Sequence, residues 1–129
     1  MAPVVSRHRA HEELDLYRLS KRVCLDLYAL TKSFPKSERL GLVEQIRRSA
    51  VSVPVNIAEG AGRRSKKEFE RFLLIARSSA NELLVLLEIA HETGSLEPTK
   101  FAHCQQTLER IFAMTSGLIA HLGSSGTRR

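Results

Sequence analysis

The sequence predicts an all-α protein, an up-down-up-down antiparallel four-helix bundle. Apolar residues recur at spacings of three and four in four long segments of the 129-residue chain, which is the pattern of amphipathic helices. Only 7 Gly and 4 Pro are present, too few for the many tight turns of an all-β protein. The segments between the predicted helices are short, roughly four to seven residues, and short loops between long helices favour antiparallel neighbours.

The first predicted helix runs from about Glu12 to Ser33, and Pro35 prevents its continuation. Residues 1–11 lack the helical pattern and carry Arg7 and Arg9, so we expect a flexible basic arm. The apolar stripe of the helix comprises Leu16, Val23, Leu27, Leu30 and Phe34, with Leu14, Tyr17, Cys24 and Tyr28 beside it.

The second predicted helix runs from about Ser37 to Ala58 and contains an interior proline, Pro54. Proline cannot donate to the carbonyl of Ala50 and costs a helix about 3 kcal/mol, so we expect a kink between these two residues. Gly60 and Gly62 are expected to end the helix. Its apolar stripe comprises Val43, Ile46, Ala50, Val53 and Ile57.

The third predicted helix begins at the sequence Ser65–Glu68, an S-x-x-E capping box, and ends at Gly94. About 29 helical residues would make it roughly 43 Å long. The fourth helix begins near Pro98, a residue suited to the first turn, and ends at Gly123. The predicted bundle domain therefore spans residues 12–123, and residues 124–129 form a flexible tail.

The apolar stripes of the first and third predicted helices are wider than a four-helix core needs. A homo-oligomer that buries the additional apolar face is one interpretation. The alternative is that central helices of small bundles simply have broad apolar faces.

The chain is basic, with 20 Lys and Arg against 14 Asp and Glu. This surplus favours an anionic partner, nucleic acid first and a membrane surface second. The cations are densest where the third helix begins, and a helix N-terminus already attracts phosphate through its free amides and dipole. The alternative is a solvated turn whose charge only aids solubility. The candidate nucleic-acid-binding residues are Arg47, Arg48, Arg63, Arg64, Lys66, Lys67 and Arg71.

The two cysteines, Cys24 and Cys104, provide no disulfide framework, which favours a reducing compartment. No secretory signal pattern begins the sequence, and the longest aliphatic run, Leu83–Leu87, is far too short to span a membrane. We therefore expect a cytoplasmic protein with no membrane association.

Polar residues gather around the interior proline of the second helix and opposite it on the third. Buried polar groups need hydrogen-bond partners, so the cluster is expected to pin the kink. Glu59 and Glu82 could instead act in acid–base catalysis or hold a metal, but no Glu-x-x-His motif accompanies them. No nucleophile with a base can be assembled either, so we expect no enzyme, no cofactor and no metal. The cluster comprises Ser52, Pro54, Asn56, Glu59, Ser79 and Glu82.

The segment Ser52–Gly60 resembles the S-[IV]-P-x-N-I-A-E-G signature of the four-helix-bundle family of 23S rRNA-intervening-sequence proteins. Further residues fall in the family's order and spacing between about Leu14 and Leu122, although the family usually has Gly-Ser where this chain has Ser78-Ser79. The resemblance implies an up-down bundle that assembles into a ring, commonly a pentamer. It also implies distant relatives among the accessory proteins of diversity-generating retroelements, which are basic rings that bind nucleic acid and a reverse transcriptase. No catalytic residues are implied.

These observations lead to two hypotheses. The first is a non-enzymatic homo-oligomer that binds RNA or DNA through phosphate contacts, in which Arg7 and Arg9 of the arm also take part. The second is a protein-interaction scaffold whose basic face docks an acidic or polymerase-like protein partner.

Overall fold

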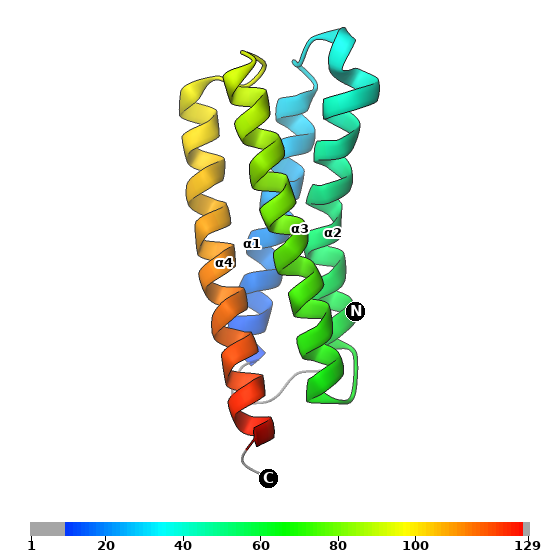
Figure 1. Ribbon diagram of the computed structural model, residues 1–129, viewed down its shortest axis with the longest axis vertical. Coiled ribbons are helices and arrows are strands. Elements are labelled where there is room, and N and C mark those ends of the chain that lie inside the picture. Colours follow the sequence, from blue (N-terminus) through cyan, green and yellow to red (C-terminus); the bar gives the residue numbers. More distant parts are fainter. Residues whose placement is uncertain (1–9, 128–129) are drawn as a thin grey trace.

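The computed structural model describes residues 10–127, and these form helices and turns without any strand. The four long helices lie side by side along the longest axis (Figure 1); the α2–α3 connection lies at one end, and the α1–α2 and α3–α4 connections lie at the other. The predicted all-α class with four long helices is confirmed. The elements are α1 (Ala10–Thr31), the 3₁₀ helix η2 (Lys36–Glu38), the π-helix η3 (Arg39–Val43), α2 (Glu44–Ala61), α3 (Lys66–Glu92) and α4 (Pro98–Thr127).

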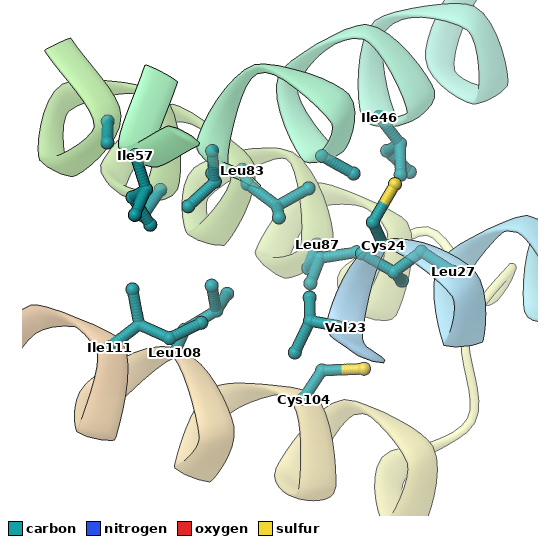
Figure 2. Close-up of a cluster of buried hydrophobic side chains, with 14 of the residues drawn as sticks. Val23, Cys24, Leu27, Ile46, Ile57, Leu83, Leu87, Cys104, Leu108 and Ile111 are labelled. Carbon is teal, nitrogen blue, oxygen red and sulfur yellow. The ribbon is translucent and has the colours of Figure 1, made fainter. Parts of the chain in front are cut away.

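One hydrophobic core lies between the four long helices. Figure 2 shows side chains from every helix converging, among them Leu27 of α1, Ile57 of α2, Leu83 of α3 and Leu108 of α4. Each of these four is at most 1% exposed. The predicted stripes therefore face inward, and burial of such stripes is the main force that holds short amphipathic helices in place.

The second predicted helix begins later than expected. The chain passes through η2 and η3 before α2 starts at Glu44, whereas the pattern predicted one helix from about Ser37. No side chain between Phe34 and Val43 is fully buried, and Leu42 is the one hydrophobic residue of this stretch that packs against the core, so little apolar surface holds it to the bundle. Gly41 lowers the helix propensity further, by about 1 kcal/mol relative to alanine.

Gly60 does not end α2, contrary to the prediction. The helix continues to Ala61, and Gly62 is its C-cap with φ −83°. A Cβ added to Gly60 would lie 2.7 Å from the Cβ of Phe72 and 2.9 Å from Cδ1 of Phe69. Gly60 is therefore required for the close approach of α2 and α3, the most extensively packed pair of helices.

The ends of α3 agree with the sequence. The Ser65 hydroxyl accepts a hydrogen bond from the amide of Glu68 at 3.0 Å, which confirms the predicted N-cap. The helix ends at Glu92, and Gly94 adopts φ +88°, a conformation that favours glycine.

The outer ends of α1 and α4 differ from the prediction. α1 begins at Ala10, inside the predicted arm, and Arg7 and Arg9 lie outside the described residues. α4 begins at Pro98 as predicted but continues past Gly123 to Thr127. Gly94 is the one glycine with positive φ in the described part of the chain, so Gly123 keeps a helical conformation and does not stop α4. None of the helices within residues 10–127 is long and apolar enough to cross a membrane.

Candidate nucleic-acid interface

The seven predicted cations fall into two groups at opposite ends of the bundle. Arg47 and Arg48 lie in the first turns of α2, and the other five surround the α2–α3 turn (Figure 1). A helix rises 1.5 Å per residue, so about 22 Å of helix axis separates Arg48 from Arg63. The structure does not bring the two groups together. We call the five residues of the second group the turn cluster: Arg63, Arg64, Lys66, Lys67 and Arg71.

An aromatic ring organises two arginines of the turn cluster. The guanidinium of Arg63 lies 4.9 Å from the centroid of the Phe72 ring, and that of Arg71 lies 4.6 Å from it. Arg63 is also ion-paired with Glu59, and Arg71 with Glu68, each at 3.3 Å. All four charged side chains are about half exposed, so each ion pair stabilises the fold by at most about 1 kcal/mol. Exchange of these carboxylates for another anion is therefore energetically accessible.

The remaining cations of the turn cluster have no ion pair within residues 10–127. Arg64, Lys66 and Lys67 are exposed where α3 begins. The amides of the first helical turn and the positive end of the helix dipole lie at the same place. Three carboxylates occur between Glu59 and Arg71, so the region keeps an excess of positive charge.

Arg47 holds two helices together, a role that the sequence did not reveal. Its Nε donates to the hydroxyl of Thr31 at 2.9 Å, and its Nη2 donates to the carbonyl of Tyr28 at 3.2 Å. The guanidinium also lies 4.7 Å from the centroid of the Tyr28 ring. Thr31 is buried and donates in turn to the carbonyl of Leu27 at 2.7 Å. Arg47 thus connects α2 to the C-terminal turn of α1, whereas Arg48 is exposed.

Two hollows lie beside Arg47, and they include cations that the sequence analysis missed. The first, which we call the end hollow, has a volume of about 320 Å³. Its lining residues are Thr31, Lys32, Phe34, Pro35, Arg39, Val43 and Arg47. The second hollow has a volume of about 430 Å³ and is lined by Tyr28, Arg39, Leu40, Val43, Glu44, Arg47 and Arg48. The run of cations on both sides of Pro35 is the sequence signal that could have indicated Lys32 and Arg39.

A further basic hollow opens between α1 and α4, with a volume of about 390 Å³. Arg18, Arg22 and Arg110 line it together with Asp15. Arg18 and Arg22 are one turn apart on α1, but Arg110 comes from α4 and is distant in sequence. Only the packing of the two helices brings these three arginines together.

Three of the predicted polar residues form a hydrogen-bonded cluster across α2 and α3. The hydroxyls of Ser52 and Ser79 are 2.7 Å apart. The Asn56 side-chain amide donates to the Ser52 carbonyl at 2.8 Å and to its hydroxyl at 3.0 Å. Pro54 is buried inside α2, which continues as a helix on both sides of it.

The two carboxylates assigned to the same cluster lie outside it. Glu59 is exposed and paired with Arg63, and Glu82 is exposed on α3. Because both carboxylates face solvent, the structure does not form the buried pair that acid–base chemistry would need. Within the described residues, no three His, Cys, Asp or Glu side chains are grouped so that they could hold a metal ion.

The two cysteines belong to the hydrophobic core, where Figure 2 shows both. Burial raises the pKa of the Cys24 thiol. Burial, with the negative charge of Asp26, raises the pKa of Cys104 to about 11 against the opposing effect of Lys100. A thiolate is the nucleophilic form, so Cys24 and Cys104 are poor nucleophiles at neutral pH.

Comparisons with known proteins agree with this architecture. The family model of the 23S rRNA-intervening sequence protein matches residues 12–117. The structure is also similar to a crystal structure of a protein with unknown function from the S23 ribosomal protein family of Bacteroides thetaiotaomicron VPI-5482. That likeness has a TM-score of 0.79 at 22% sequence identity and covers 84% of this chain and 98% of the other, so it shows the fold alone. No functionally curated protein matches the chain. Because the family model spans most of the sequence, this protein belongs to the 23S rRNA-intervening sequence protein family.

Proposed function

We propose that this protein is a non-enzymatic homo-oligomer that binds nucleic acid through phosphate contacts at the turn cluster. The observation that carries the proposal is the exposure of Arg64, Lys66 and Lys67 at the start of α3, without ion pairs among the described residues. The family is named for 23S rRNA intervening sequences, which makes RNA the first nucleic acid to test.

The side chains around Phe72 support phosphate binding at this place. One ring orients both Arg63 and Arg71, which reduces the conformational entropy that each would lose on binding. A phosphate would replace Glu59 and Glu68 as the partner of these guanidinium groups, and arginine matches phosphate oxygens in a bidentate geometry. Binding of this kind is independent of sequence and weakens as the salt concentration rises.

Exposed apolar side chains support the homo-oligomeric part of the proposal. They lie mainly on α2 and α3, whereas the width of the sequence pattern pointed to the first and third helices. A protomer surface with several exposed aliphatic residues is typical of an interface that covers them. An up-down bundle and a ring, commonly a pentamer, are what the family resemblance adds. The exposed aliphatic residues on these two helices are Val51, Val55, Leu74, Ile75, Val85 and Ile89.

Three simultaneous charge reversals test the site at its unpaired cations: Arg64→Glu, Lys66→Glu and Lys67→Glu. The matched control reverses three exposed cations that line none of the basic hollows, Lys21, Lys36 and Lys100, so that both variants have the same net charge. Light scattering measures the mass of the assembly, and RNA binding is measured alongside it, at about 0.15 M and about 0.5 M salt. The Debye length is about 8 Å at the lower concentration and shorter at the higher one, so phosphate contacts are screened more strongly there.

We expect an oligomer that takes up RNA at the lower salt, loses RNA in the turn-cluster variant and keeps it in the control. Equal loss in both variants would mean that net charge alone, and not the turn cluster, drives binding. An oligomer indifferent to RNA would reject the nucleic-acid proposal in favour of a protein-interaction scaffold, and a monomer would reject self-assembly.

A further inference from the structure

The end hollow combines apolar walls with three cations at the end of the bundle opposite the turn cluster. Three apolar side chains line it, Phe34, Pro35 and Val43. Phe34 and Val43 are otherwise buried in the bundle. Lys32, Arg39 and Arg47 supply the charge, and no carboxylate is among the lining residues. Its volume of about 320 Å³ is at the lower end of the range of small-ligand sites.

Arg47 is held in a fixed orientation at this hollow. Thr31 and the carbonyl of Tyr28 engage its Nε and Nη2, and the Tyr28 ring supports one face of the guanidinium. Within the described residues, Nη1 of Arg47 makes no hydrogen bond, so two N–H donors are available to a ligand. A guanidinium fixed in this way loses little conformational entropy when it binds an anion.

The second hollow continues the same surface. Three residues line both hollows, Arg39, Val43 and Arg47, and we call the two arginines among them the cationic wall. Tyr28, 38% exposed, and Leu40, 86% exposed, line the second hollow but not the first, and Leu40 is the most exposed large hydrophobic side chain of the described residues. Apolar surface is thus available on both sides of the cationic wall.

We propose that the end hollow binds one unpaired nucleotide of single-stranded RNA, with its phosphate on Arg39 and Arg47 and its base against Phe34, Pro35 and Val43. This inference rests on the proposed nucleic-acid function and adds a second contact site with its own ligand chemistry. Inorganic phosphate would leave the apolar walls uncovered, and an apolar peptide would leave three cations without partners. Duplex bases are stacked and paired, so they cannot enter a hollow of this size.

The test uses adenosine monophosphate as the probe, with adenosine and inorganic phosphate as separate arms, in calorimetric titrations of the full chain at low salt. The variant carries Lys32→Glu and Arg39→Glu, two exposed residues whose side chains make no hydrogen bond within the described residues, and leaves Arg47 in place. Lys21→Glu with Lys100→Glu is the control, because it makes the same change in net charge at two exposed residues that line none of the basic hollows. Circular dichroism checks that both variants fold.

We expect the nucleotide to bind at least about tenfold more tightly than adenosine or phosphate, and the hollow variant to lose this binding by at least about tenfold. The control should stay within about twofold. For a single-stranded RNA, the salt slope of log K should become shallower by about 0.7 in the hollow variant, since the one phosphate held at the hollow contributes about 0.7. For a duplex, the slope should not change.

A nucleotide that binds no better than phosphate, or equal losses in the hollow variant and the control, would overturn the inference. RNA binding that still depends on the turn cluster would then show that the proposed function survives without the hollow. If the unmodified protein binds no RNA at low salt, the proposed function fails and the inference fails with it.

Discussion

Replacement of Gly60 by alanine should destabilise the protein, although glycine-to-alanine changes inside helices normally stabilise. The usual gain is about 1 kcal/mol, because alanine loses less backbone entropy on folding. At Gly60, however, the new Cβ would lie 2.7 Å from the Cβ of Phe72 and 3.3 Å from the carbonyl oxygen of Phe69. Both atoms are fixed to the α3 backbone, so rotation of a side chain cannot relieve the overlap.

The size of the effect follows from this geometry. Restoration of an ordinary contact of 3.4 Å requires α2 and α3 to separate by about 0.7 Å at this point. A radial gap of about 0.5–1 Å already loses a quarter to a half of the dispersion attraction between the atoms beside it. We therefore expect a cost of about 1–3 kcal/mol, as for other overpacked cores.

Denaturant unfolding at fixed protein concentration measures the effect, because self-association makes stability depend on concentration. Gly117→Ala is the matched control: Gly117 also lies inside a helix, but nothing is within 4 Å of its added Cβ. We expect Gly117→Ala to stabilise by about 0.5–1 kcal/mol. If Gly60→Ala stabilised to the same degree, the argument from the close approach of α2 and α3 would be refuted.

Three further predictions address the polar contacts and the core. Ser52→Ala and Ser79→Ala should each cost about 1 kcal/mol, and their double-mutant cycle should give a coupling of at least about 0.5 kcal/mol; additive effects would contradict the bond. Arg47→Ala should cost about 1–3 kcal/mol by denaturant unfolding, whereas Arg48→Ala should change stability by less than about 0.5 kcal/mol. The raised pKa of Cys104 stabilises the fold fully below its ordinary value of 9.0, and this contribution is lost as the pH rises towards about 11. Stability should therefore fall over that interval more steeply in the unmodified protein than in Cys104→Ala, and parallel curves would argue against the shift.

Much of the fold could be predicted because its determinants are local in sequence. The stripe that includes Ile46, Val53 and Ile57 is a periodicity within one helix, and all three residues are buried. The Ser65 cap joins two residues only three positions apart. The prediction failed at Gly60, because the residue that requires a glycine there, Phe72, belongs to the next helix.

The candidate site was predictable in the same uneven way. The turn cluster could be predicted because its cations are neighbours in sequence. Ser52 and Asn56 could be predicted for the same reason, since both lie within two residues of Pro54. The split of the basic surface was not foreseen, because the second helix was expected to begin near Ser37, whereas α2 begins at Glu44 and has Arg47 and Arg48 in its first turns. Lys32 and Arg39 were missed because the turn between α1 and α2 was expected to be partly helical.

By itself, therefore, the sequence determined the helical class, the inward faces of the helices and the excess of positive charge, all of which follow from residue type and spacing along one helix. Which groups each arginine contacts, in contrast, depends on the packing of the helices. Arg47 is committed to Thr31 and Tyr28 of α1, while Arg63 and Arg71 share the ring of Phe72. The physical reason is that hydrogen bonds and cation–π contacts act over a few ångströms of space, and only the packing of helices brings residues from different segments within that range.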